Sequence, residues 1–92
     1  MVSLMLYRSF LVGMKWVSVG GVRLKQVDSG ARGILWGTSA KNKIYYRTGI
    51  NRKRPTGSGW VHVRGRLNFV SPGCRGVVGV DKRGKIYQYI GK

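Results

Sequence analysis

Residues 60–67 read WVHVRGRL, and residues 16–24 read WVSVGGVRL. The two tryptophans lie 44 positions apart, and the two leucines lie 43 apart. The correspondence continues along the chain and ends in Lys-Ile-Tyr triplets at residues 43–45 and 85–87, which lie 42 apart. Two single-residue gaps account for the drift. The chain therefore contains two copies of one repeat, and this period is the strongest indication of its fold.

Each copy divides into four short apolar runs, separated by Gly, Asp, Asn or Ser. Such runs, rich in β-branched and aromatic side chains, are typical of strands. The breaks at residues 40–42 and 81–84 predict hairpin turns. Four antiparallel strands per repeat of this length are typical of a propeller blade. We therefore predict an all-β fold of two four-stranded antiparallel blades, a partial β-propeller, with strands at 16–19, 24–28, 34–38, 43–47, 60–63, 66–70, 77–80 and 85–90.

The repeat divides the chain into an N-terminal segment at 1–15, a first blade with its connection at 16–59, and a second blade at 60–92. Residues 6–9 resemble residues 45–48, which predicts the last strand of a preceding blade. A closed propeller has about four to eight blades. Two blades therefore predict either completion by homo-oligomerisation or membership of a longer propeller.

Residues 2–13 are apolar enough to resemble a signal peptide, but Arg8 interrupts them and no clean small-residue cleavage site follows. No stretch reaches the roughly 18 apolar residues that a membrane-spanning helix needs. We therefore treat the N-terminal segment as part of the fold.

Lysine and arginine total 18 against two acids, which gives a formal charge of +16. Such a charge attracts polyanions: nucleic acid, anionic lipid, lipopolysaccharide or sulfated glycan. The cations are scattered, so many of them are expected to be solvated strand faces and turns. Cys74 and His62 are the only residues of their types, and Asp28 and Asp81 occupy equivalent turn-like regions. We therefore predict no enzyme activity, no metal site and no cofactor.

The second copy resembles a tectonin β-propeller repeat, through Trp60-Val61-x-Val63-x-Gly65-x-Leu67 and the later series Gly76-Val77-x-Gly79-Val80-Asp81 and Lys85-Ile86-Tyr87. Residues 44–50 and 55–60 resemble the segment between blades of the same family, to which the fish-egg lectins belong. The first copy departs from the pattern at residues 34–38, where the family usually places Trp, Gly, Val and Asn in close order.

The resemblance covers residues 16–92 and implies a propeller that binds carbohydrate, often bacterial lipopolysaccharide or egg-surface glycan, without catalysis. It implies a secreted protein, with a cytoplasmic location as the alternative because some relatives act at membranes inside cells. The family normally carries five or six blades, so a site between neighbouring blades is expected to be incomplete in two.

Seven side chains form the predicted ligand-binding set, because they combine aromatic rings that match the apolar face of a sugar with cations that match its anionic groups: Trp36, Tyr46, Arg47, Arg52, Lys53, Arg54 and Arg64. Trp36 has no counterpart in the second copy. Trp16 and Trp60 share one repeat position and are interpreted as packing residues between blades.

Tyr46 and Arg47 begin the long connection to Trp60, and connections often carry function. Arg47 can hold a carboxylate or phosphate by two parallel hydrogen bonds, or contact carbonyl groups of a neighbouring blade. The basic run at 51–55 is either a solvated loop or a polyanion-binding patch. We expect it to project beside Arg64 and Arg66.

Three functions remain open on these grounds. The first is a lectin-like module for glycan or lipopolysaccharide, with anionic lipid as a further partner. The second is a nucleic-acid-binding protein, which is less favoured because the repeat explains the aromatic residues as packing positions. The third is a propeller fragment that associates through its open edges and has no specific ligand.

Overall fold

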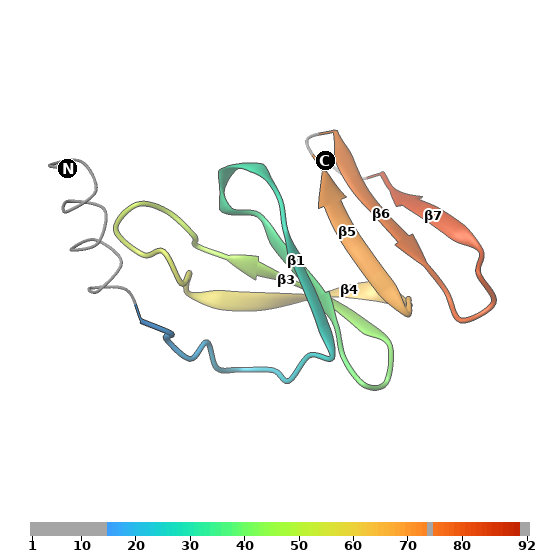
Figure 1. Cartoon of the computed structure of the whole chain (residues 1–92), viewed down its shortest axis with the longest axis horizontal. Coiled ribbons are helices and arrows are strands. Elements are labelled where there is room, and N and C mark those ends of the chain that lie inside the picture. The colour runs from blue at the N-terminus through green and yellow to red at the C-terminus, as the bar shows by residue number, and fades with distance from the viewer. Residues whose placement is uncertain (1–14, 74, 91–92) are drawn as a thin grey trace, which may run out of the picture.

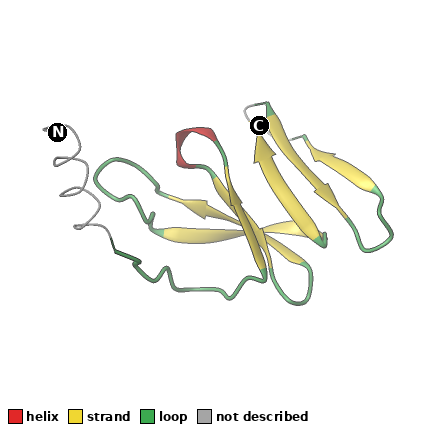
Figure 2. Cartoon of the chain, in the orientation of Figure 1, coloured by secondary structure: helices red, strands yellow, loops and turns green. Residues whose placement is uncertain are grey.

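The computed structural model describes residues 15–73 and 75–90, and these form two antiparallel β-sheets (Figure 1). The first sheet contains β1 (Gln26–Ser29), β2 (Leu35–Thr38), β3 (Lys43–Thr48) and β4 (Gly59–Arg66), in that order. The second sheet contains β5 (Phe69–Gly73), β6 (Gly76–Val80) and β7 (Ile86–Tyr89). A single 3-10 turn, η1 (Ala31–Gly33), connects β1 to β2 (Figure 2). The predicted all-β fold of antiparallel blades is confirmed, although the second sheet has three described strands where four were predicted.

Three predictions fall on residues outside these ranges. They are the strand of a preceding blade at 6–9, the signal-peptide character of 2–13, and any role of Cys74.

The strand that contains Trp60 lies in a different sheet from the one expected. Residues 60–63 were predicted to begin the second blade, but β4 pairs with β3 along its length, from Thr48 opposite Gly59 to Lys43 opposite Arg66. The Ser58 N–H donates to the Thr48 carbonyl at 2.8 Å and closes the hairpin that joins them. Strands that follow one another along the chain usually pair or lie side by side. The repeat boundaries therefore describe the sequence period, while the sheets divide between β4 and β5.

Residues 16–19 form no strand, although the equivalent residues 60–63 do. Residues 60–63 are extended because β3 supplies their hydrogen-bond partners, and no described strand lies beside 16–19 in the same way. Trp16, for which we expected packing between blades, is fully exposed. Trp60 is partly buried, and its indole Nε1 donates to the Gly20 carbonyl at 2.8 Å. Gly21, at φ +107°, packs on the same ring, where a Cβ would lie 2.8 Å from the indole Cδ1.

The apolar core lies between the two sheets. Its buried members are Trp36 of β2, Ile44 of β3 and Val70 of β5, which are 7%, 4% and 1% exposed. Partly buried apolar side chains pack around them, namely Tyr46, Val63, Leu67 and Val77. The core therefore exists only where the first sheet faces the second.

A side-chain amide connects the innermost strands of the two sheets. Gln26 on β1 donates from Nε2 to the Val70 carbonyl at 2.6 Å and accepts from the Val70 N–H at 3.0 Å through Oε1. The fully buried Thr38 hydroxyl donates to the same Oε1 at 3.3 Å. Gln26 thus satisfies both backbone groups of Val70, as a neighbouring strand would.

Equivalent positions of the two repeats meet beside this amide. The Lys25 ammonium donates to Asn68 Oδ1 at 2.7 Å, and the Ser71 hydroxyl donates to Asp28 Oδ2 at 2.6 Å. Both pairs are separated by 43 residues. Residues that lie one sequence period apart therefore contact each other, in or directly before β1 and β5.

Replacing Gln26 by Leu tests the amide contact. The variant leaves the N–H and carbonyl of Val70 without partners, so we expect the free energy of unfolding to fall by about 1–3 kcal/mol. Equilibrium denaturation measures this loss. Gln88, exposed on β7, supplies the control, since Gln88→Leu is expected to change stability by less than about 0.5 kcal/mol. Equal losses in both variants would contradict the contact.

Candidate functional site

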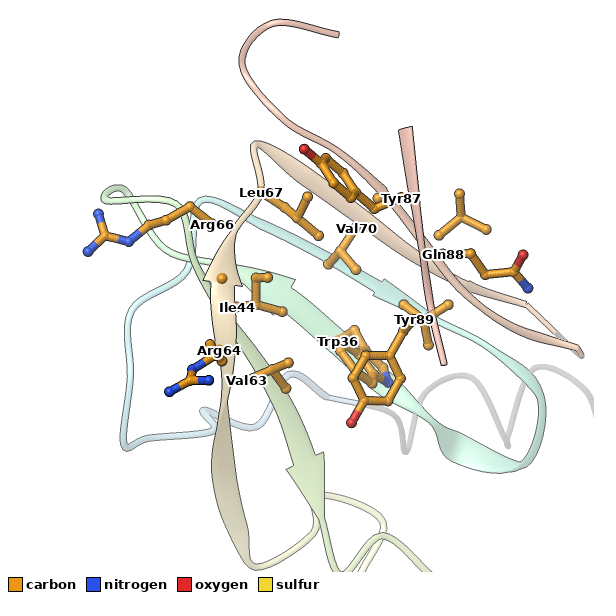
Figure 3. A pocket seen from close by; sticks show the side chains of 14 residues that line it. Trp36, Ile44, Val63, Arg64, Arg66, Leu67, Val70, Tyr87, Gln88 and Tyr89 are labelled. Atoms are coloured by element: carbon orange, nitrogen blue, oxygen red, sulfur yellow. The ribbon is translucent and has the colours of Figure 1, made fainter. Parts of the chain in front are cut away.

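A cavity of about 310 Å³ lies between the two sheets. Figure 3 shows its walls: Trp36 and Ile44 from the first sheet, and Val70, Tyr87 and Tyr89 from the second. The lining is predominantly apolar, and Arg64 and Arg66 at the end of β4 supply its cations.

Three aromatic rings line the cavity, those of Trp36, Tyr87 and Tyr89, and Tyr46 packs behind Trp36 without lining it. The ring centroid of Trp36 lies 5.1 Å from that of Tyr46 and 5.3 Å from that of Tyr89, within the range of stabilising aromatic pairs. Trp36 is largely covered by these neighbours, whereas Tyr87 and Tyr89 are 44% and 48% exposed. The open part of the aromatic wall therefore belongs to β7. The ligand-binding roles of Trp36 and Tyr46 stay predictions.

Alternation along β7 explains why both tyrosines line the cavity. Residues two apart on a strand lie on the same face of the sheet, so Tyr87 and Tyr89 share a face. The register aligns Tyr87 with Gly79 and Tyr89 with Val77 on β6. Because Gly79 has no side chain, Leu67 packs directly over it, between β6 and the rest of the cavity lining.

A bulge at the end of β4 sets the two arginines at the cavity. Ile44 pairs with Val63 and Lys43 pairs with Arg66. The two residues of β4 between these pairs, Arg64 and Gly65, therefore have no pairing partner on β3. Gly65, at φ +112°, occupies the bulge, where a left-handed backbone favours glycine. Figure 3 shows the Arg64 and Arg66 guanidinium groups turned away from the aromatic wall toward solvent. The apolar cavity therefore has cations at its edge rather than in its interior.

Arg47 contacts the loop between β3 and β4. Its Nε donates to the Thr56 carbonyl at 2.8 Å, and its guanidinium lies 5.0 Å from the centre of the Trp60 ring. Arg47 pairs with Trp60 across the sheet, whereas Tyr46 pairs with Trp36 on the opposite face. The structure thus separates Arg47 from the cavity, and its role toward a ligand stays a prediction.

The basic loop residues Arg52, Lys53 and Arg54 are exposed. Asn51 shapes the loop, because its Oδ1 accepts the N–H groups of Lys53 at 2.9 Å and Arg54 at 3.0 Å. The side chains therefore project from an ordered turn.

The expectation that this loop lies beside Arg64 and Arg66 is wrong. The loop precedes β4, whereas the two arginines lie at the far end of that strand (Figure 1). An extended strand rises about 3.3 Å per residue, so Gly59 and Arg64 are separated by roughly 17 Å. The predicted cations therefore form two groups.

Residues with the capacity for catalysis or metal binding are dispersed. Within 15–73 and 75–90, no group of three or more His, Cys, Asp or Glu residues could hold a metal ion. His62 is exposed beside Tyr45, at 5.2 Å between ring centres, and Asp28 is engaged by Ser71. In the same part of the chain, the structure has no helix of the length and apolar character needed to cross a membrane.

Sequence reasoning did not include Tyr87 and Tyr89 in the site. Their spacing, with two aromatic residues on one face of a predicted strand, was the available signal. Arg66 was noted only as a neighbour of the basic loop. Its position at the cavity depends on the bulge, which the sequence marks only by Gly65.

Two packed sheets derived from one repeat, joined at their inner strands, define the chain as a β-propeller-type protein. A family model, the Tectonin domain, matches residues 6–92. The chain belongs to the tectonin family, whose members are lectin-like propeller domains not known as catalytic. No curated protein matches the sequence.

Arg47→Ala tests the structural role of Arg47. Losing the contact to Thr56 is expected to open the loop and speed tryptic cleavage after Arg52 or Lys53, about fivefold for a hydrogen bond worth about 1 kcal/mol. Timed digestion with mass spectrometry measures the rate. Arg64→Ala, which removes an arginine elsewhere on the same hairpin, is the control. An unchanged rate in the Arg47 variant would show that the loop is held by other contacts.

Proposed function

We propose that this chain is a non-catalytic, lectin-like module that binds carbohydrate, with anionic glycans such as lipopolysaccharide as its ligand class. The observation that carries the proposal is the pair of half-exposed tyrosine rings, Tyr87 and Tyr89, in the cavity between the sheets. The membership of the lectin-like tectonin family supports it.

The cavity suits one sugar unit. Its volume of about 310 Å³ lies at the lower end of the range for small-molecule sites. One face of a pyranose carries mainly C–H groups, which pack on an aromatic ring. The exposed rings of β7 offer that contact, and the covered Trp36 ring supports Tyr89 from behind at 5.3 Å.

The cations account for the anionic part of the ligand class. Arg64 and Arg66 lie at the edge of the cavity, so a sulfate, carboxylate or phosphate on the sugar can reach a guanidinium group while the ring stays on the aromatic wall. Secretion and contact with anionic lipid are part of this proposal, since lipopolysaccharide is a surface glycolipid.

The formal charge of +16 favours a second candidate, a general polyanion-binding protein for nucleic acid or anionic membrane. Binding of that kind depends steeply on salt and is insensitive to neutral sugars. The two candidates are therefore separable by competition.

Tyr89→Ala tests the lectin proposal. We expect it to weaken binding of purified lipopolysaccharide and of N-acetylglucosamine oligosaccharides about tenfold, which corresponds to roughly 1.4 kcal/mol. Titration calorimetry measures the affinity. Tyr45→Ala is the control, because Tyr45 lies on the opposite face of the first sheet beside His62. Binding that no neutral sugar inhibits, and that Tyr89→Ala leaves unchanged, would favour the polyanion candidate.

A further inference from the structure

A second cleft, of about 380 Å³, lies beside the cavity. The β2–β3 turn, the end of β4 and the β6–β7 turn enclose it, and the two turns occupy equivalent places in the two repeats. Its lining is polar and predominantly cationic, and consists of Lys41, Asn42, Arg66, Asp81, Lys82, Arg83 and Tyr87.

The positive charge of the cleft is not balanced within the protein. Four of its residues are cationic and Asp81 is its one acid. The chain has two acids in all, and Asp28 is engaged by Ser71 at 2.6 Å. The sequence holds no further Asp or Glu side chain to neutralise these cations, so the cleft attracts an external anion.

Asp81 shapes the β6–β7 turn. It accepts the N–H groups of Lys85 at 3.0 Å and Arg83 at 2.9 Å, and the Tyr87 hydroxyl at 3.2 Å. These hydrogen bonds, first that of Lys85, lower the pKa of Asp81 below its ordinary value. The Asp81 carboxylate therefore stays charged and also interacts with the charge of Arg83. It offsets one of the four cations, so the cleft keeps an excess of three positive charges.

The β2–β3 turn, on the other side of the cleft, is also fixed by hydrogen bonds. Asn42, at φ +65°, donates its N–H to the Ser39 carbonyl at 2.8 Å. Its own carbonyl accepts the Leu67 N–H at 3.0 Å, which ties the turn to the segment between β4 and β5. Both walls are therefore ordered before any ligand arrives, which reduces the entropic cost of binding.

We propose that this cleft binds a phosphate group carried by the saccharide whose ring lies in the adjacent cavity. Arg66 and Tyr87 line both spaces, so a phosphorylated sugar can occupy them together. Phosphate is the matching chemistry because its several oxygens accept from lysine and from the two-pronged guanidinium group. The inference rests on the proposed function for the sugar part alone.

The test compares N-acetylglucosamine 1-phosphate, N-acetylglucosamine and inorganic phosphate as probes in calorimetric titrations. The phosphorylated sugar is expected to bind at least about tenfold more tightly than the neutral sugar, because it adds charge-assisted hydrogen bonds. Combining Lys82→Gln with Arg83→Gln is expected to remove that advantage and leave the neutral sugar unaffected.

The matched control combines Lys15→Gln with Arg23→Gln, which removes the same charge from exposed residues that line neither the cavity nor the cleft. Equal loss in both double variants would reduce the effect to general electrostatics and overturn the proposal. Binding of the neutral sugar with no gain from phosphate would also overturn it, while the proposed function stands. Binding of inorganic phosphate alone, sensitive to Lys82 and Arg83, would keep the anion site and reject the saccharide.

A separate observation concerns the faces of the sheets that point away from the core. Val27 pairs with Gly37 on β2, and its repeat equivalent Val70 pairs with Gly79 on β6. In space, Val78 therefore takes the place of Trp36, although the sequence alone assigned Trp36 no counterpart. Trp36 is buried against the second sheet, whereas Val78 is 44% exposed. The far face of the second sheet therefore corresponds in the repeat to the core face of the first sheet, but it is exposed.

Two further pairs of equivalent residues show the same difference in exposure. Ile44 is buried in the core, and its repeat equivalent Ile86 is 73% exposed. Val70 is buried, and its equivalent Val27, on the far face of the first sheet, is 56% exposed. The exposed face of the second sheet thus corresponds to the core face of the first sheet, and the exposed face of the first sheet corresponds to the core face of the second. Together they match the two surfaces that already pack on each other inside the chain.

We infer that two copies of this chain associate. The far face of the first sheet of one copy packs on the far face of the second sheet of the other copy. Such a contact is head-to-tail, so it uses different surfaces on the two copies. It would also create another cavity between the copies. The formal charge of +16 per chain opposes it, so association is expected to strengthen with salt.

Light scattering after size exclusion, from micromolar to millimolar protein and at low and high salt, measures the mass. The wild-type chain is expected to exceed the monomer mass, and Ile86→Arg and Val27→Arg are each expected to remain monomeric. Their equimolar mixture is expected to form a dimer, because each variant retains the face that the other lacks. Thr56→Arg, which adds the same charge on the distant loop, should still associate. A monomer throughout, or no dimer in the mixture, would overturn the inference.

Discussion

The amide of Gln26 and the backbone of Val70 form the contact on which the arrangement of the two sheets depends. Each sheet alone is a small twisted ribbon with one apolar face, and neither can bury that face by itself. The paired hydrogen bonds at 2.6 and 3.0 Å align β1 with β5, and that alignment places Trp36 and Ile44 over Val70. The cavity and the cleft both form at this junction, so the candidate sites are products of the packing of one repeat on the next.

The period in the sequence predicted the strands well and their grouping less well. Hydrophobic runs and turn residues identify where the chain is extended, because those signals are local. Which strands share a sheet depends on hydrogen-bond partners, and the period carries no information about them. The strand at 60–63 therefore appeared to open a repeat, although it completes the first sheet with β3. Residues 16–19 have the same local pattern and form no strand, which shows that the partner decides the outcome.

The same distinction applies to the site. Trp36 and Tyr46 could be selected from their residue type and their departure from the repeat, and the structure brings their rings to 5.1 Å. Tyr87 and Tyr89 were treated as repeat positions, and their place in the cavity follows from the packing of one sheet on the other. Arg52, Lys53 and Arg54 were grouped with Arg64 because they are near in sequence. The extended β4 separates them, so proximity along the chain was a poor guide to proximity in space.

The large positive charge and the aromatic cavity make different contributions to recognition. Charge scattered over the whole chain draws any polyanion to the surface, and it acts mainly on the rate of encounter and on salt dependence. Such charge cannot select one glycan from another, because its electrostatic field is spread over the surface and depends little on the structure of the ligand. Selection requires a concave surface with groups at fixed positions, which the tyrosines of β7 and the arginines of the β4 bulge provide. Since those groups meet only across the sheet junction, the specificity that we propose for this protein depends on the repeat pair rather than on either blade.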